Sequence, residues 1–358
     1  MRAGWNSKPF DDCIEKVTYT KKIHRKDFLA EGALPIVSQE EDFINGYWDD
    51  ETNLFKTKTP IVVFGDHTKV LKYVDFDFVL GADGVKILKP RDFLLPKFFY
   101  YQLQTANLDS LGYARHYKLL KELKIVYPIL PEQQRIVGIL DEAFAGIATA
   151  KANAEKNLQN ARALFDSYLN AMFTRRGEGW EEKPLGKVCE NLDSKRIPIT
   201  KNKRMAGEYP YYGASGVVDH VNDYIFDEDL LLVSEDGANL LARTYPIAFS
   251  VTGRVWVNNH AHVLRFPDFA SQRFMEYYLN SIRLDPYVNG MAQPKLNQNS
   301  LNTIPVPTAP VSQKKLVVAQ LDSFRDATQR LESIYQQKLD ALDELKKSLL
   351  HQAFSGAL

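Results

Sequence analysis

Clusters of hydrogen-bonding side chains and glycines follow the predicted strands of this chain. In its first half, Gly65-Asp66-His67-Thr68-Lys69 comes directly after an apolar run, and Gly81-Ala82-Asp83-Gly84 closes the next one. In its second half, Ser234-Glu235-Asp236-Gly237 occupies the matching place. Polar loops at strand ends, in which glycine permits a close approach, suit hydrogen bonding to the edges of nucleic acid bases. Each of these loops also fits ordinary turn chemistry.

We therefore predict two groups of contacts to nucleic acid, one in each half of the chain. The residues of the first group are Lys21, Lys22, Gly65, Asp66, His67, Thr68, Lys69, Lys72, Asp83, Arg115 and Lys118. The residues of the second group are Tyr212, Ser215, Glu235, Asp236, Asn239, Arg243, Arg254, Gln293 and Lys295. Carboxylates can accept a hydrogen bond from cytosine, whereas asparagine, glutamine, lysine and arginine suit adenine and guanine.

Sequence patterns for catalysis and for cofactor binding are missing. The chain contains no Pro-Pro pair for the loop of an amino methyltransferase, no Gly-x-Gly after a strand and no Walker loop. The spacing of Asp109, Glu122 and Lys124 resembles that of nuclease active-site residues, but spacings this loose arise by chance in most chains of this length. His260 and His262 could share one strand face as metal ligands, but no third ligand is evident. We expect no catalytic residue, no cofactor and no metal in this chain.

Composition indicates a folded protein with a balanced charge. The chain carries 45 Lys and Arg against 45 Asp and Glu, and this balance argues mildly against nucleic acid binding. Local basic clusters nevertheless occur at residues 21–26 and 195–204. The two cysteines, Cys13 and Cys189, fit core thiols of a protein in the reducing cytoplasm. No stretch of about 18 apolar residues exists, so we expect no membrane span. The opening residues Met1–Lys8 lack the apolar core of a signal peptide, so we expect none.

The chain repeats itself with a period near 180 residues. The opening Gly4-Trp5 returns as Gly179-Trp180, and the aromatic segment Phe98–Leu103 returns as Phe274–Leu279. Near the end of each half, Ser167–Thr174 parallels Ser348–Ser355. Because the matches keep the same order, the chain consists of two equivalent halves.

Each half closes with one long predicted helix, which opens after Pro131 or Pro310. Apolar residues recur along both helices at seven-residue steps, which is typical of a coiled-coil seam; burial against the preceding domain is the alternative. If the helices run antiparallel, the small Ala154 and Ala161 fit opposite the bulky Tyr335 and Leu339. The candidate interface residues on this seam are Leu140, Ile147, Leu158, Phe165, Leu321, Tyr335, Leu342 and Leu349.

These patterns predict an α+β protein in four segments. Residues 1–130 and 177–308 contain β-branched and aromatic runs between Gly and Pro, and they would form two pseudo-symmetric α/β domains. Residues 131–176 and 309–358 would form two long antiparallel coiled-coil helices that separate the domains. The domains agree in their frame and differ most in their polar loops, as expected of two readers of different sequences.

The repeat layout and several motifs resemble the specificity subunits of type I restriction-modification systems. The motifs are the opening Trp5-x-x-Lys8-Pro9-Phe10 with its copy at Trp180, Phe64–Thr68, Ile129–Val137 and Gln352–Gly356. The likeness covers the whole chain. The second half departs from the family pattern at Val311–Lys315, where the Pro-Glu-Gln-Gln element of the first half is diluted.

The resemblance implies a non-catalytic protein that binds double-stranded DNA at a site in two parts. Each domain would be a target recognition domain that docks in the major groove, and the helices would bind two methyltransferase subunits. Those partners would supply S-adenosyl-methionine and methylate adenine. Separate motor-nuclease subunits, with ATP and Mg²⁺, would add restriction. The partners could also supply much of the phosphate contact, which accounts for the balanced charge.

Two other classes of protein stay open on the sequence alone. One is a coiled-coil adaptor whose two similar heads bind protein, which the near-neutral domains favour. The other is a nuclease or a methyltransferase, which the missing motifs disfavour. Co-purification with a methyltransferase would separate the specificity subunit from both.

Overall fold

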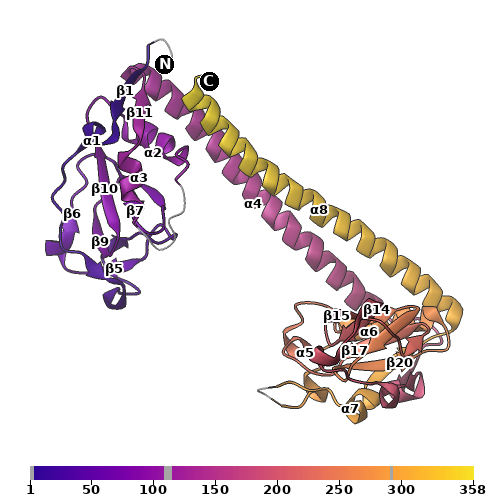
Figure 1. Ribbon diagram of the computed structural model, residues 1–358. Helices are drawn as coiled ribbons and strands as arrows, with labels where there is room; N and C mark the ends of the chain where they lie inside the picture. The colour runs from indigo at the N-terminus through magenta and orange to yellow at the C-terminus, as the bar shows by residue number, and fades with distance from the viewer. Residues whose placement is uncertain (1–3, 109–114, 291–292) are drawn as a thin grey trace. The chain divides into compact units, whose positions relative to one another are not determined.

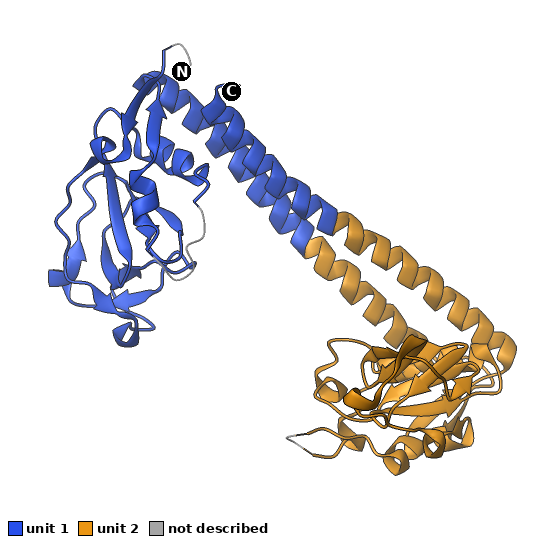
Figure 2. Ribbon diagram, in the orientation of Figure 1, with its two compact units in different colours: residues 1–155, 336–358 blue, residues 156–335 orange. Residues whose placement is uncertain are grey.

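The computed structural model describes residues 4–108, 115–290 and 293–358, so Asp109 lies outside the described residues. It contains two compact units (Figures 1 and 2). Unit 1 comprises residues 1–155 and 336–358, and unit 2 comprises residues 156–335. Each unit combines β-sheets and short helices with parts of two long helices. Among the described helices, none combines the length and the apolar composition that a membrane span requires.

Unit 1 contains two main sheets and a separate strand pair. The first sheet has the order β2-β10-β7-β8, the second has the order β3-β9-β4-β5 with β6 on β9, and β1 pairs with β11. The strands are β1 (Asn6–Pro9), β2 (Ile14–Glu15), β3 (Ile23–His24), β4 (Leu34–Val37), β5 (Gly46–Trp48), β6 (Leu54–Phe55), β7 (Ile61–Gly65), β8 (Leu71–Val74), β9 (Phe78–Ala82), β10 (Val85–Pro90) and β11 (Lys124–Tyr127). The short helices are α1 (Phe10–Cys13), α2 (Pro96–Gln104) and α3 (Tyr117–Lys121).

Unit 2 repeats this plan. Its sheets have the orders β13-β20-β17-β18 and β15-β14-β19-β16, and β12 pairs with β21. The strands are β12 (Glu181–Pro184), β13 (Glu190–Asn191), β14 (Ala206–Gly213), β15 (Gly216–Val221), β16 (Phe226–Asp227), β17 (Leu230–Ser234), β18 (Ala248–Val251), β19 (Arg254–Val257), β20 (Ala261–Arg265) and β21 (Pro305–Thr308). The short helices are α5 (Asn239–Ala242), α6 (Phe269–Ser281) and α7 (Gln298–Thr303).

The two units share one topology. The order β13-β20-β17-β18 matches β2-β10-β7-β8, and β14 runs parallel to β19 as β4 does to β9. The middle strands β7 and β17 are buried at every residue, which explains their continuous apolar runs. The predicted fold, two pseudo-symmetric α/β domains with two long helices, is confirmed.

The long helices have 45 residues each. They are α4 (Leu130–Thr174) and α8 (Val311–Ser355). In unit 1, Lys151 Nζ of α4 lies 2.7 Å from Asp343 Oδ1 of α8. In unit 2, Arg162 Nε of α4 lies 3.0 Å from Glu332 Oε2 of α8. Because the later part of one helix lies beside the earlier part of the other, the two helices are antiparallel within each unit, as Figure 2 shows.

The predicted seam residues differ in burial. Ala154 and Ala161 are buried, as small seam residues should be. Leu140 and Leu321 belong to the cores that the helices form with the sheets and short helices of units 1 and 2, so burial against the domain is the correct interpretation at these two positions. They are therefore not available to a partner subunit. Ile147 is buried, and Leu158, Phe165, Tyr335, Leu342 and Leu349 are half-buried.

An aromatic trio ties one end of a long helix into each unit. In unit 1 the ring of Phe98 lies 5.1 Å from that of Phe354 on α8 and 6.1 Å from that of Trp5. In unit 2 the ring of Phe274 lies 5.2 Å from that of Phe173 on α4 and 5.2 Å from that of Trp180. Aromatic pairs at such distances stabilise a core beyond the area that they bury. The repeated tryptophans of the sequence thus mark equivalent core positions.

Cys13 and Cys189 should react slowly with Ellman's reagent in the native protein at about pH 8, and readily after unfolding. Burial raises the pKa of Cys13 to about 11 and that of Cys189 to about 12, so little of the reactive thiolate is present. Thiol release followed with and without guanidinium chloride measures this difference. Immediate reaction of both thiols in the native protein would contradict the prediction.

Candidate nucleic acid interface

Asp66 is the centre of the polar cluster in unit 1. It follows strand β7 directly, and its side chain is buried. Its N–H donates to Gly84 O at 2.7 Å, and its carbonyl accepts from the N–H of His116 at 2.7 Å. Its carboxylate accepts from the N–H of Tyr117 at 2.7 Å and lies 3.9 Å from Lys86 Nζ. Asp66 therefore joins three separate segments of the chain.

Basic residues surround the neighbouring turn between β9 and β10. Lys22 Nζ donates to Val85 O at 3.0 Å. Burial lowers the pKa of Lys22, and the charge of Lys86 lowers it further, whereas Asp83 and Asp66 act in the opposite direction. The structure thus brings together four of the predicted contacts, which are Lys22, Asp66, Asp83 and Arg115. Arg115 is held near the others because the N–H of the next residue, His116, donates to the carbonyl of Asp66. Arg115 and Asp83 are exposed.

The segment after Asp66 is held by Gln39, which the sequence did not single out. The N–H of His67 donates to Gln39 Oε1 at 3.2 Å, and Thr68 Oγ1 donates to Gln39 O at 2.5 Å. Lys69 has a positive φ of 62°, and its Nζ donates to Leu108 O at 3.4 Å. No signal in the sequence links Gln39 to this loop, because the contacts join segments that are distant in the chain.

Glu235 occupies in unit 2 the place that Asp66 occupies in unit 1. It follows strand β17, its N–H donates to His260 O at 2.9 Å, and its carbonyl accepts from the N–H of Leu296 at 2.8 Å. Its carboxylate lies 2.6 Å from Arg196 Nη1 and 3.2 Å from Lys295 Nζ. The same backbone scheme thus carries different side chains in the two units.

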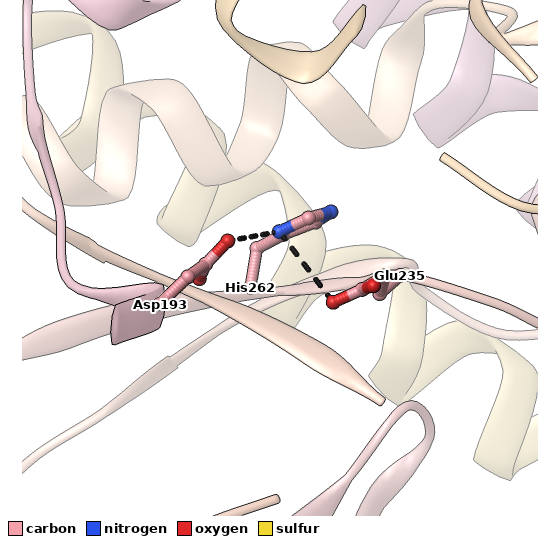
Figure 3. Close-up of side chains that lie close together, drawn as sticks. All are labelled: Asp193, Glu235 and His262. Atoms are coloured by element: carbon pink, nitrogen blue, oxygen red, sulfur yellow. Dashed lines mark hydrogen bonds and ion pairs between the residues drawn. The ribbon is translucent and has the colours of Figure 1, made fainter. Parts of the chain in front are cut away.

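The side chains of His262, Asp193 and Glu235 lie close together (Figure 3). His262 Nδ1 lies 2.6 Å from Asp193 Oδ2 and 3.9 Å from Glu235 Oε2, and His262 Nε2 donates to Leu296 O at 2.7 Å. Both ring nitrogens therefore face oxygen atoms of the fold. Burial by itself would raise the pKa of Asp193. The hydrogen bond and charge of His262, the hydrogen bond from the N–H of Val263 and the charge of Arg196 together outweigh it, so this pKa lies below its usual value.

This group of three side chains is the sole candidate for a metal site among the described residues. Its geometry instead fits a network of hydrogen bonds and ion pairs, since both ring nitrogens of His262 already have partners within the fold and the cation of Arg196 lies 2.6 Å from Glu235. His260, which the sequence offered as a second metal ligand, pairs with Asp236 at 2.7 Å. Arg196 belongs to the basic cluster at residues 195–204, but the sequence did not predict its pairing with Glu235 and did not single out Asp193.

Several predicted contacts point into the protein. Lys72 is buried, and its Nζ donates to Asn45 Oδ1 at 3.0 Å and to the carbonyl of Asp42. Burial lowers the pKa of Lys72 to about 8. Asn239 Oδ1 accepts from the N–H of Thr244 at 2.9 Å, so this side chain closes a turn. We no longer expect Lys72 and Asn239 to contact DNA, because their polar atoms have partners inside the fold.

Two arginines that we predict to contact DNA form hydrogen bonds or ion pairs within the protein. Arg243 adopts a positive φ of 55° and donates to the carbonyls of Leu279 and Ile282 at the end of α6. Arg254 lies 3.1 Å from Asp227 on the neighbouring strand β16 and is exposed. The interpretation of Arg243 as a base reader is therefore replaced by a structural one, whereas Arg254 stays a prediction.

The remaining candidates stay predictions of DNA contact. Gly65 is buried at the end of β7, where a Cβ would lie 2.2 Å from Thr68 Oγ1, so it permits a close approach within the protein. Tyr212 is half-buried, and Ser215 Oγ lies 2.9 Å from the hydroxyl of the exposed Tyr245, which the sequence did not single out. The exposed candidates are Lys21, Thr68, Asp83, Arg115, Lys118, Ser215, Arg254, Gln293 and Lys295, with Lys22, His67, Lys69 and Asp236 half-buried.

Glu235→Ala should lower the free energy of unfolding by about 3 kcal/mol, because it leaves the guanidinium of Arg196, whose side chain is only 13% exposed, without its closest carboxylate. Lys295→Ala removes an exposed partner of the same carboxylate, and we expect a change below about 0.5 kcal/mol. Urea denaturation of the full chain compares the two variants. A stable Glu235→Ala protein that has lost DNA binding would show instead that Glu235 contacts bases.

Comparison with known proteins agrees with this geometry. The family model described as the type I restriction modification DNA specificity domain matches residues 3–159 and again residues 177–341. A putative type I restriction enzyme specificity subunit of Haemophilus influenzae, S.HindORF215P, is 31% identical over 208 residues, which are 53% of this chain and 52% of that protein. The EcoR124I/EcoR124II specificity subunit of Escherichia coli is 26% identical over 228 residues, 58% of this chain and 55% of that protein.

The matched region spans about half the length of these two relatives. Solved structures extend the likeness of the fold to the whole chain. One, from work on complex assembly and conformational transition of the type I R-M system, has a TM-score of 0.76 at 15% identity, covering 100% of this chain and 99% of that one. The HsdS subunit from Thermoanaerobacter tengcongensis has a TM-score of 0.58 at 16% identity, covering 100% and 98%. Because one family model matches both halves, this chain belongs to the type I restriction-modification DNA specificity family.

Proposed function

We propose that this protein reads a two-part DNA site and positions methyltransferase subunits on it. The observation that carries the proposal is the pair of equivalent loop clusters, one after β7 and one after β17. They share a backbone scheme and differ in side chains, with Asp66 and Arg115 in unit 1 against Glu235 and Lys295 in unit 2. Two similar frames with different polar residues suit the reading of two different half-sites.

The chain itself would catalyse no reaction. Carboxylates at the centre of the two clusters are engaged by Tyr117 in unit 1 and by Arg196 in unit 2, so they have a structural role. S-adenosyl-methionine would be bound by the methyltransferase partners, and ATP with Mg²⁺ by motor-nuclease partners. The cytoplasm, where chromosomal DNA lies in a bacterial cell, is the proposed location.

Methylome mapping tests this function. The chain is co-expressed with the methyltransferase that co-purifies with it, in a host that lacks both, and methylated adenines are mapped. We expect one motif with two defined parts and an undefined gap of fixed length. The purified chain alone, with labelled S-adenosyl-methionine and DNA, should transfer no methyl group. A continuous motif, or methyl transfer by the lone chain, would contradict the proposal.

The same experiment distinguishes a specificity subunit from a coiled-coil adaptor. An adaptor whose heads bind protein would co-purify with partners, but its replacement by a relative would leave the methylated sequence unchanged. A specificity subunit determines that sequence.

Leu331→Asp with Ile334→Asp should weaken assembly with the methyltransferase at least tenfold, about 1.4 kcal/mol. Both side chains lie on α8, one helical turn apart, and are 39% and 55% exposed. Exposed apolar neighbours on a helix are typical of a protein interface. Gln329→Asp, two residues before Leu331 and also exposed, is the matched control, because it lies on another side of the helix. Size-exclusion chromatography of the mixed proteins measures assembly; unchanged co-elution of the double variant would place the methyltransferase elsewhere.

A further inference from the structure

Helix α4 is tied to unit 1 by a group that we call clasp 1, made of Lys97, Tyr101 and Asp141. Asp141, on α4, accepts hydrogen bonds from Lys97 Nζ at 2.8 Å and from the hydroxyl of Tyr101, both on α2. The ring of Tyr101 meets that of Phe144 edge-on, at 5.3 Å and 85°. Burial, followed by the hydrogen bond to Asp141, raises the pKa of Tyr101, so its hydroxyl stays a donor.

Helix α8 is tied to unit 2 by clasp 2, made of Arg273, Tyr277 and Asp322. Asp322, on α8, accepts from Arg273 Nη2 at 2.7 Å and from the hydroxyl of Tyr277, both on α6. Arg325 Nη2 lies 3.2 Å from Asp322 Oδ1 and adds a second cation. Burial, followed by the hydrogen bond to Asp322, raises the pKa of Tyr277.

The two clasps are equivalent in the repeat. In each, the cation precedes the tyrosine by one helical turn, and the aspartate lies near the start of the long helix. The loops of the candidate interface differ between the units, yet this attachment has the same chemistry in both. A charge-assisted pair that is kept while its surroundings differ indicates a role that both units share.

The clasps act on the elements that carry the candidate interface. Helix α2 packs on β7 and β8, and α6 packs on β17 and β18. Strands β7 and β17 end at Asp66 and Glu235. Apolar packing between helices has no preferred direction, whereas a hydrogen bond requires a defined angle. The clasp therefore adds a directional contact to those that orient the sheet around the axis of its long helix, beside the hydrogen bond from Leu95 N–H to Gln133 of α4 in unit 1 and that from Lys314 of α8 to Ser271 in unit 2.

We propose that Asp141 and Asp322 are positioning residues that determine which gap length between half-sites this protein accepts. The proposal rests on the proposed function, since it concerns a two-part site. A unit held at one orientation presents its loops to the major groove at one helical phase of DNA. A unit that can rotate on its helix would also accept a gap one base pair longer or shorter, which shifts that phase by about 35°.

The test removes clasp 1 without creating a buried, unpaired group. Tyr101→Phe keeps the ring against Phe144, and Asp141→Ala removes the acceptor, so no hydroxyl is left without a partner. The double variant should therefore unfold at nearly the wild-type denaturant concentration. Glu344→Ala with Lys347→Ala, which removes an exposed ion pair on α8 in the same unit, is the matched control.

Two measurements follow on the full chain. Spin labels at Lys58→Cys in unit 1 and Ala148→Cys on α4, both exposed positions, report the distance between the sheet region and its helix. We expect a broader distance distribution in the clasp variant than in the wild type and the control. Methylation by the assembled complex of DNA with a gap one base pair too long or too short should rise about tenfold relative to the correct gap, as expected for the loss of one charge-assisted hydrogen bond.

An unchanged distance distribution would overturn the positioning role. A broader distribution with an unchanged gap preference would overturn the link to the gap. A wild-type complex that methylates no two-part site would contradict the proposed function itself, and the wild-type arm of the assay shows this separately from the variants.

Discussion

Replacing residues 1–130 with the corresponding region of a relative should change one half of the methylated motif and leave the other half unaltered. The polar clusters that we assign to the two half-sites belong to separate units, with Asp66 at the centre of one and Glu235 at the centre of the other. Each has its own sheet and its own core. We therefore expect a new set of loops in unit 1 to leave the loops of unit 2, which rest on their own core, unchanged.

The donor region must preserve the attachment to the helices. It should retain counterparts of Phe98, which meets Phe354, and of Trp5, which meets Phe98. It should also retain counterparts of Lys97 and Tyr101, which meet Asp141. The reciprocal replacement of residues 177–308 is the matched control and should change the other half. Methylome sequencing of both hybrids measures the result, and a change in both halves by either hybrid would refute independent reading.

Matched insertions of seven residues in both long helices should lengthen the gap of the DNA motif by one to three base pairs. Helix α4 passes from unit 1 to unit 2 after Glu155, and α8 passes back after Tyr335. Seven residues add about 10 Å to a helix, which equals roughly three base pairs of DNA. The heptad step keeps Ile147, Ala154 and Ala161 on the seam.

Insertion of two residues in each helix is the control, because it rotates the following apolar residues by about 200°, away from the seam, and should abolish assembly. The half-site sequences themselves should stay unchanged in the seven-residue variant. An active seven-residue variant that keeps the original gap would show that the helices do not set the distance.

The sequence predicted those features that depend on patterns within one segment. Each of these patterns arises from the burial of one element. They are the repeated tryptophans, the continuous apolar runs of β7 and β17, and the heptad steps of α4 and α8. Their counterparts in the structure are the aromatic trios, the two buried strands and the antiparallel helix pairs. The equivalence of the two halves followed from the order of these segments alone.

The side chains of the candidate interface were harder to interpret. Asp66 and Glu235 were predicted as base readers because they follow strands, but their roles depend on Tyr117 and Arg196, which are distant in the chain. One sign was available for Lys72, since strand β8 alternates and places it on the same buried face as Val74. No local pattern distinguishes a carboxylate that meets a base from one that meets an arginine of its own fold.

Unit 1 is built from two stretches at opposite ends of the chain, which affects its folding during synthesis on the ribosome. Its core includes Leu350 and Ala353, and Phe354 packs against this core, whereas unit 2 is built from the continuous stretch 156–335. A growing chain therefore holds every residue of unit 2 before it holds those of unit 1, although unit 1 begins first. During that interval the surface around Phe98 lacks its closing helix and exposes apolar side chains. Chaperones that bind nascent chains should engage this surface until the last turns of α8 emerge.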